Sequence, residues 1–423
     1  MTIKTSAAVC ALLVLGVLTG CTRDVPEAPA TPTPTPVLPQ PVELSFSEAV
    51  PGPLAIGLMV PPVEGEGSEY RPLAEGAGVA VQRFALTGTT IRLVVALDDG
   101  TVAGALASMN SLVDARVAGV VMAASGEHTS EALAAAAAAG VPVVMPYAQP
   151  PAATDGVWSL APTAAQTVAA LDVALKDRGA SKPILVSDDI LVTALAPGQI
   201  APAAVVSPAD PTAAAERILS GVHDLTADSA IIDAPPEQQA AVVVALQTAL
   251  GDLQIPILLT PQALTPAFSQ ALIRGGAANS HLISVGPDDD DPASLARGRQ
   301  ADAAAAYYAA VRLGANDPGC RNIYNDDSCA RTAPYADIAS HDALVALVRA
   351  AERAHSTTPG AVRQALSGLA LTVADGLAGP PLDFASPAAL PDAAVVPLHS
   401  STTDPGVRPA PSGGRLYWFS GAS

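Results

Sequence analysis

The 423-residue sequence is poor in aromatic residues, in charged residues and in positive charge. Only 3% of its residues are aromatic and 14% are charged, whereas 50% are hydrophobic, a composition typical of a globular core rather than of a disordered chain. Its 21 Lys and Arg stand against 40 Asp and Glu, which gives a formal net charge of -19. Because such a surface repels phosphate groups and no basic cluster offsets it, we expect no nucleic-acid partner.

The sequence also lacks the short motifs that bind nucleotides or build common catalytic sites. No Gly-x-Gly-x-x-Gly opens a helix after the first expected strand, and no Walker-type Gly-Lys-Ser/Thr occurs, so we expect no cofactor. The six His are dispersed, and Ser125-Gly126 is not a Gly-x-Ser-x-Gly elbow. The run Asp288–Asp291 lacks the spaced oxygens of a calcium loop and is expected to solvate a turn. We therefore expect neither a metal site nor enzymatic activity.

The N-terminus carries an export signal. Residues Ala7–Gly20 form an uncharged, largely apolar run of 14, shorter than the roughly 20 residues that span a bilayer, so residues 1–20 are expected to be a signal peptide. The run ends in Leu18-Thr19-Gly20-Cys21, which resembles a bacterial lipobox. That resemblance implies that Cys21 carries lipid and anchors the protein to the extracytoplasmic face of the cell membrane. The alternative is an ordinary secreted protein with a chance cysteine.

Residues 21–53 are expected to form a linker after the lipidated cysteine. The segment contains Ala-Pro-Ala-Thr-Pro-Thr-Pro-Thr-Pro and further prolines. Such sequences stay extended at about 3.1 Å per residue and act as semi-rigid spacers. We expect this stalk to hold the folded part away from the membrane.

Only four cysteines are present, and two of them remain once Cys10 leaves with the signal peptide and Cys21 is lipidated. Cys320 and Cys329 lie nine positions apart in an exported protein, where oxidising conditions favour a disulfide. We predict a bridged surface hairpin. A two-cysteine metal site is the alternative, but flanking His or further Cys are missing.

From Leu54 onward, short apolar runs alternate with Ala-rich helical patterns. The expected strands are Leu54–Val60, Ile91–Leu97, Gly119–Met122, Val141–Met145, Pro183–Ser187, Ser229–Asp233, Pro256–Thr260 and His281–Val285. The expected helices are Leu73–Phe84, Val102–Ala115, Ser130–Ala139, Ala164–Arg178, Thr212–Val222, Glu237–Leu250, Pro266–Arg274, Leu295–Leu313 and Tyr335–His355. This alternation predicts an α/β fold with parallel, doubly wound sheets. A barrel would also use eight strands, but the change to long helices after Val285 favours two Rossmann-like lobes.

The order and spacing of several segments resemble those of the type I periplasmic substrate-binding proteins of ABC importers, the branched-chain amino-acid binding group. The segments that carry the resemblance include Ala55–Val60, Gly76–Val81, Val120–Ser125, Ala139–Pro146, Leu160–Thr163, Pro334–Ala336, His341–Ala343, Ser356–Leu366 and Gly376–Pro380. The resemblance implies three crossings between the lobes, which we place near Ser187, Val285 and Asp375. The first lobe is then 54–187 plus 286–375, and the second is 188–285 plus 376–423.

In that family the ligand lies between the lobes, beyond the carboxyl ends of the strands. The resemblance implies that the first lobe holds it through Ser125, Gly126 and the loop Tyr147-Ala148-Gln149, and the second through Asp188 and Gln262. Without the resemblance, Ser125-Gly126 would be read as an ordinary turn. The sequence departs from the family, because Gln149 stands for a Thr, Gln262 for an acidic partner of the ligand ammonium, and Ala234-Pro235 for an aromatic. Asp188, Asp189 or Asp233 could supply the missing charge, or could be solvated loop carboxylates.

The leading hypothesis is a lipid-anchored solute-binding protein that captures a small polar solute, such as an amino acid or an amide, and presents it to the permease of an ABC importer. The alternative is an envelope lipoprotein that keeps the fold as a scaffold or regulator. The two glutamines and the shortened, Pro-broken segment Ile190–Ala204 favour that alternative.

Overall fold

The structure is a computed structural model that describes residues 41–188, 200–251, 253–276, 281–409 and 418–421. The expected signal peptide, Cys21 and residues 22–40 of the linker lie outside the described residues, and so does most of the segment Ile190–Ala204. In the part that is described, no helix combines the length and the apolar character needed to cross a membrane.

Five parallel strands form the first sheet, in the order β2-β1-β3-β4-β5. They are β1 (Leu54–Val60), β2 (Ile91–Leu97), β3 (Val120–Met122), β4 (Val143–Met145) and β5 (Val157–Ser159). The first four confirm strands expected from continuous apolar runs, which parallel strands show because both faces are covered. The strand β5 was missed, because its Val157 and Trp158 are followed by Ser159 and do not form the continuous apolar run seen in β3 and β4.

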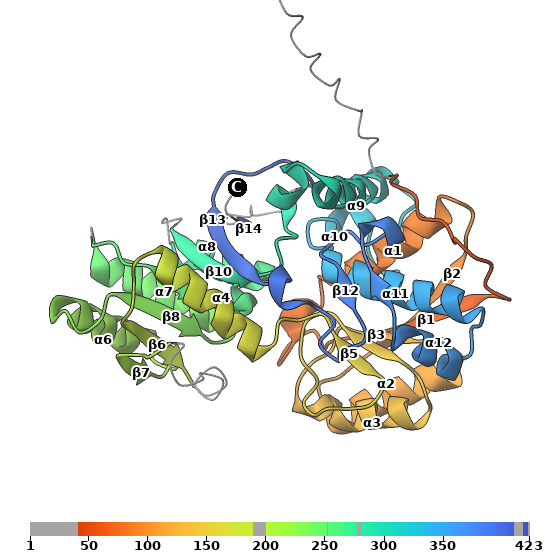
Figure 1. Cartoon of the computed structure of the whole chain (residues 1–423), viewed down its shortest axis with the longest axis horizontal. Helices are drawn as coiled ribbons and strands as arrows, with labels where there is room; N and C mark the ends of the chain where they lie inside the picture. The colour runs from red at the N-terminus through yellow and green to blue at the C-terminus, as the bar shows by residue number, and fades with distance from the viewer. Residues whose placement is uncertain (1–40, 189–199, 252, 277–280, 410–417, 422–423) are drawn as a thin grey trace, which may run out of the picture. The chain divides into compact units, whose positions relative to one another are not determined.

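Two layers of helices cover the first sheet. Successive residues of β1 point to opposite faces, so Ile56 and Leu58 join one core cluster whereas Ala55 and Met59 join another. The first cluster includes α1 (Glu75–Ala85), α11 (Ile338–Ala354) and α12 (Pro359–Leu366), and the second includes α2 (Val102–Asp114) and α3 (Ser130–Ala138). Figure 1 shows α2 and α3 together on the side of the sheet away from α11.

A second sheet of seven strands has the order β14-β13-β10-β9-β8-β6-β7. The strands are β6 (Pro183–Ser187), β7 (Ala204–Val206), β8 (Ser229–Asp233), β9 (Ile257–Leu259), β10 (Leu282–Gly286), β13 (Val396–Ser401) and β14 (Trp418–Gly421). The strands from β7 to β10 are parallel, whereas β13 and β14 are antiparallel. The predicted α/β class with parallel sheets is therefore confirmed, with an antiparallel edge that was not predicted.

The helices of the second sheet also lie on two faces. Ile184, Val186 and Ile232 share a core cluster with α6 (Pro211–His223), α7 (Pro236–Leu250) and α8 (Pro266–Gly275). Leu185, Ile231 and their neighbours face α4 (Ala164–Asp177), whose Leu171 and Leu175 belong to the same cluster as the core of the first lobe. The two lobes thus share one continuous hydrophobic cluster on the α4 side.

Two of the three predicted crossings are displaced along the chain. The boundary at Ser187 is wrong, because β6 pairs with β8 and α4 packs on β10 and β13, so the chain leaves the first lobe between β5 and α4. After β10 ends at Gly286, α9 (Arg299–Asn316) packs on α1 of the first lobe. An apolar run reads alike in either sheet, which explains why the sequence did not locate the first crossing.

The third crossing lies after Asp375. The hairpin of β11 (Ala370–Leu371) and β12 (Leu382–Asp383) is followed by a bridge between Ala388 and Ser159. The Trp158 indole donates a hydrogen bond to the Phe384 carbonyl (2.9 Å), which keeps this stretch on the first lobe. The chain enters the second sheet only at Val396, so the boundary at Asp375 is wrong as well.

The folded part begins earlier than the predicted boundary at Leu54. Leu44 is 5% exposed and belongs to the main core cluster. The Arg83 guanidinium donates to the Val42 carbonyl (2.7 Å), and the Glu352 carboxylate accepts from the Ser47 backbone amide (2.5 Å). Residues 41–48 therefore belong to the first lobe and are not part of a free stalk.

The predicted disulfide between Cys320 and Cys329 is present, with 5.4 Å between the two Cα atoms. An antiparallel bridge between Arg321 and Ser328 makes the enclosed segment a small hairpin, as expected. The second cysteine begins α10 (Cys329–Thr332), which packs against α9.

Candidate functional site

The candidate site is formed by the loops that follow the carboxyl ends of the parallel strands, where α/β sheets place their ligands. In the first lobe these loops are 61–70 after β1, 123–129 after β3 and 146–150 after β4. In the second lobe they begin at Asp188 after β6, at Ala234 after β8 and at Thr260 after β9. None of the three first-lobe loops contains Lys or Arg. In the second lobe, Asp188 and residues 234–237 and 260–265 contain none either.

Ser125 and Gly126 lie where the resemblance placed them, directly after β3. Ser125 is 7% exposed, and Gly126 has a φ of 114°, a left-handed conformation that favours glycine. The loop continues into η2 (Glu127–Thr129), where the Thr129 hydroxyl donates to the Gly126 carbonyl (2.7 Å). His128 Nε2 lies 2.6 Å from Asp98 Oδ2 just after β2, which ties the loop to a strand that lies beyond β1 in the sheet.

The loop after β1 covers these two residues. A Cβ atom built on Gly67 would lie 2.7 Å from Ser125 Oγ, and one built on Gly126 would lie 2.8 Å from the Glu66 carboxyl carbon. Both positions therefore need glycine for this close approach. The carboxylate of Glu66 lies where an anionic ligand group would approach Gly126.

Tyr147 is held by an aromatic and a polar contact. Its ring stacks on Tyr70 of η1 (Ser68–Tyr70), with centroids 4.9 Å apart and planes at 7°. Its hydroxyl donates to Asp337 Oδ1 (2.9 Å), which also accepts from the backbone amide (3.1 Å) and hydroxyl (2.6 Å) of Ser340 and so caps α11. Loss of solvation raises the pKa of Asp337 to about 6, although the three hydrogen-bond donors act to lower it. The pair Tyr70 and Tyr147 forms a rigid aromatic wall.

The other residues of this loop are tied to the backbone near the first crossing. The Gln149 side-chain amide donates to the Ala161 carbonyl (2.7 Å). The Ala148 carbonyl accepts from the Ser159 hydroxyl (2.8 Å) at the end of β5. Gln149 thus uses one N–H donor within the fold, which leaves its second N–H and its oxygen to offer a ligand.

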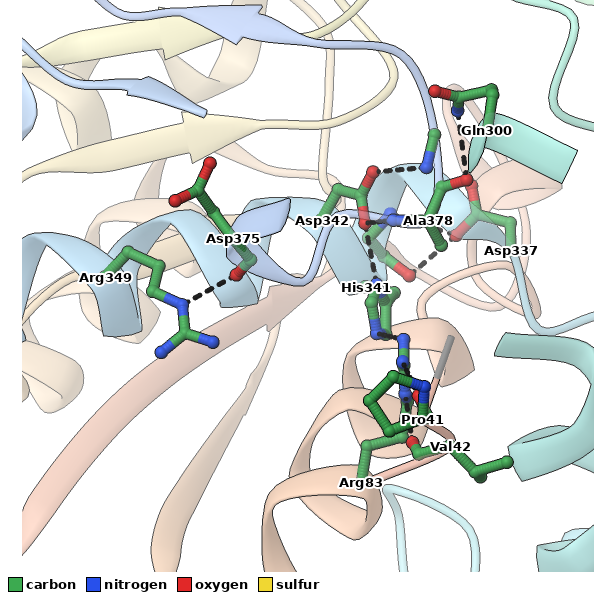
Figure 2. Close-up of polar contacts among 12 residues, drawn as sticks. Pro41, Val42, Arg83, Gln300, Asp337, His341, Asp342, Arg349, Asp375 and Ala378 are labelled. Atoms are coloured by element: carbon green, nitrogen blue, oxygen red, sulfur yellow. Dashed lines mark hydrogen bonds and ion pairs between the residues drawn. The ribbon is translucent and has the colours of Figure 1, made fainter. Parts of the chain in front are cut away.

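A buried polar chain supports α11, as Figure 2 shows. Arg83 Nη1 lies 2.9 Å from His341 Nε2, and His341 Nδ1 lies 2.7 Å from Asp342 Oδ1. Burial lowers the pKa of His341, so the ring is neutral, accepts from Arg83 and donates to Asp342. Asp342 also accepts from the amides of Ala378 (2.9 Å) and Gly379 (2.8 Å). The chain joins α1, α11 and the segment after η5 (Val373–Asp375).

In the second lobe, Asp188 and Gln262 have different surroundings. Asp188 is exposed and accepts from the Ser207 hydroxyl (2.6 Å). Gln262 lies in η3 (Pro261–Leu264), and its side-chain oxygen is buried with no hydrogen-bond partner among the described residues. Ser187 donates to Asp233 (2.9 Å), so this carboxylate is engaged within its own lobe.

The electrostatics of the loops are negative. Partial burial raises the pKa of Glu69 in η1, and the charges of Glu237 at the start of α7 and of Glu66 raise it further. Glu69 belongs to the first lobe and Glu237 to the second, so acidic groups of both lobes lie within electrostatic range of each other. An uncharged or cationic group is favoured there over an anion.

The structure brings Ser125, Gly126 and Tyr147 together with residues that the sequence did not single out, namely Glu66, Gly67, Glu69 and Tyr70. The signal was present, since a polar Gly-rich loop follows the first strand at the same sheet edge. Among the described residues, no hydrogen bond or ion pair joins Asp188 or Gln262 to the first lobe. Over the same residues, no group of three His, Cys, Asp or Glu is arranged to hold a metal ion.

No protein-family model matches this sequence, and no curated protein matches it either. Solved structures do match the fold. A type 1 periplasmic binding protein from Bordetella pertussis superposes with a TM-score of 0.61 at 17% identity, over 82% of this chain and 97% of that one.

Several of the matching structures contain ligands. The branched-chain amino acid transporter substrate-binding protein LivJ from Streptococcus pneumoniae, in complex with isoleucine, gives a TM-score of 0.61 at 17% identity, over 87% of this chain and 99% of that one. A solute-binding protein from R. palustris in complex with 4-hydroxybenzoate gives 0.59 at 15% identity, over 84% and 94%. This chain therefore has the α/β fold of the type 1 periplasmic binding proteins.

Proposed function

We propose that the protein is a lipid-anchored solute receptor, which captures a small polar solute between its lobes and presents it to the permease of an ABC importer. The observation that carries the proposal is the pairing of Tyr70 and Tyr147 beside Ser125, at the strand ends where this fold places its ligands. The unpartnered oxygen of Gln262, at the corresponding edge of the second sheet, supports it. The proposal assigns the protein no catalysis.

The loops favour an amide or an amine over a free amino acid. An α-carboxylate on Ser125-Gly126 would meet the Glu66 carboxylate, and the loops carry no Lys or Arg to compensate. Leaving a charge unpaired in a closed site costs several kcal/mol. An N–H donor would suit the Gln262 oxygen, and an apolar or cationic face would suit the tyrosine wall.

A thermal-shift screen of the full-length protein with amides, amines and amino acids tests the proposal, because a bound solute stabilises the folded state. We expect an amide or amine to raise the melting temperature. Gln262→Leu should abolish that shift, whereas Gln364→Leu, the same change on exposed α12, should keep it. A shift that survives both Tyr147→Ala and Gln262→Leu would refute the site.

The lipid anchor has its own test. Labelling with radioactive palmitate should mark the wild-type protein and not Cys21→Ser, and the variant should leave the membrane fraction. A labelled Cys21→Ser, or a variant that stays with the membrane, would contradict the anchor.

A second candidate is an envelope scaffold without a solute, and the cover that Glu66 and Gly67 place over Ser125-Gly126 favours it. This candidate predicts that no solute shifts the melting temperature of the wild-type protein. It further predicts that no solute shifts the melting temperature of Glu66→Ala, which lacks the covering carboxylate.

A further inference from the structure

A cavity of about 250 Å³ lies inside the first lobe, away from the loops at the strand ends. It is partly open to solvent and is lined by α1, by β2, by α9 and by the disulfide-bridged hairpin 320–329. Its wall is largely apolar, with Val79, Leu93, Val95 and Val311 among the lining residues. The volume far exceeds the share of one water in the liquid, about 30 Å³, and approaches the size of small-molecule sites.

One carboxyl group lies in this apolar wall. Glu75, in the first turn of α1, is 6% exposed and lines the cavity. Its Oε2 accepts from the Ile323 backbone amide (3.2 Å), but its Oε1 is buried without a hydrogen-bond partner among the described residues. A buried acceptor without a donor destabilises the folded state, so the cavity offers a ligand an unmet interaction.

The hairpin is fitted closely over the cavity. A Cβ atom on Gly78 would lie 2.9 Å from Ile323 Cγ2, so only glycine lets the hairpin approach α1 this closely. The Gln82 amide lies 2.7 Å from the sulfur of Cys320 and 3.4 Å from that of Cys329, which orients α1 to the disulfide. One wall of the cavity is thus a hairpin that the disulfide holds against α1.

We propose that this cavity is a second binding site, for a small organic ammonium ion whose charged group pairs with Glu75 and whose hydrocarbon part lies against Val79, Leu93 and Val311. A primary ammonium supplies both the N–H donor that Oε1 lacks and the opposite charge that a buried carboxylate requires. Burial of the alkyl chain adds a favourable hydrophobic contribution.

Three other charged residues face or approach Glu75. Asp326 of the hairpin adds negative charge, Arg71 before α1 adds positive charge, and Arg321 lines the cavity. Arg71 is already engaged, since it donates to the Pro61 carbonyl (2.6 Å) and lies 4.3 Å from the centre of the Tyr324 ring. Among the ion pairs of the described residues, none joins Glu75 to an arginine. The carboxyl is therefore available to a cation from solution.

Calorimetric titration of the full-length protein with n-pentylammonium chloride at pH 8 tests the site, with n-pentanol as the uncharged probe. We expect the ammonium ion to bind and Glu75→Gln to weaken it by about tenfold or more, as for loss of a charge-assisted hydrogen bond. Glu216→Gln, a matched change at an exposed position of α6, should leave the affinity within about twofold. Binding of n-pentanol should be weaker and the same in all three proteins.

A second measurement does not depend on a variant. Burial raises the pKa of Glu75 to about 7, so at pH 6.5 binding of the ammonium ion should release protons, and the binding enthalpy should depend on the buffer. Equal affinity in wild type and Glu75→Gln, no binding to the wild-type protein, or no proton release would overturn the proposal. Loss of binding in Glu69→Gln but not in Glu75→Gln would place the amine between the lobes. That result would refute the second site in the cavity and leave the proposed receptor function intact.

Discussion

Replacing Glu75 with Gln should stabilise the protein at pH 8 and change its stability little at pH 4.5. The side chain is 6% exposed, and burial raises its pKa from 4.5 to about 7. A carboxyl with a raised pKa binds its proton more tightly in the folded state, so its contribution to the free energy of unfolding falls as pH rises from 4.5 to 7. At about 1.36 kcal/mol per pH unit, this difference amounts to roughly 3 kcal/mol.

The free energy of unfolding of wild type and variant, from urea denaturation followed by circular dichroism at both pH values, measures this effect. Other buried acids such as Asp337 titrate in both proteins and cancel in the difference. Glu64→Gln is the control, because Glu64 is exposed and its replacement should change stability by less than about 0.5 kcal/mol. A difference between Glu75→Gln and wild type that is the same at pH 4.5 and pH 8 would refute the account of this carboxyl.

Three further predictions concern stability. Replacing both Cys320 and Cys329 with Ser should lower the free energy of unfolding by about 2–3 kcal/mol, as expected for a loop of about ten residues, and an unchanged urea midpoint would contradict this. Leu44→Ala should lower the free energy of unfolding by about 3 kcal/mol because Leu44 is in the main core. Leu86→Ala, at a side chain 57% exposed, should lower it by less than about 1 kcal/mol. Equal losses would mean that residues 41–48 do not pack on the first lobe. Tyr147→Phe should lower the free energy of unfolding by about 1–2 kcal/mol, because the Tyr147 hydroxyl donates to Asp337. The loss should be larger at pH 8 than at pH 5, because the pKa of Asp337 is raised to about 6. A loss that does not depend on pH would contradict this hydrogen bond.

The secondary structure could be predicted from the sequence because largely covered strands leave apolar runs, even where only three residues pair, as in β3 and β4. The strands at Leu54, Ile91, Pro183 and Ser229 were located in this way. The sequence does not show to which sheet a strand belongs. All residues of β6 are buried, as are those of β1 in the first sheet, although β6 pairs with β8 in the second. The antiparallel β13 and β14 were missed, since β13 contains Pro397 and polar residues and is only partly buried, and β14 has four residues.

The candidate site was predictable where it depends on strand ends and was not where it depends on contacts distant in sequence. Ser125, Gly126 and Tyr147 follow β3 and β4, so topology alone places them at one edge. The hydrogen bond from Tyr147 to Asp337 joins residues 190 positions apart. The cover of Glu66 on Gly126 depends on a close approach that only the folded backbone reveals.

The measurement that tests the receptor proposal most directly is the distance between spin labels on the two lobes, with and without solute. Ser111→Cys on α2 and Glu216→Cys on α6 are exposed positions on opposite lobes. Pulsed dipolar spectroscopy should show a changed and narrower distance distribution when an amide or amine from the thermal-shift screen is added. A distribution that is identical with and without every solute tested would contradict capture between the lobes.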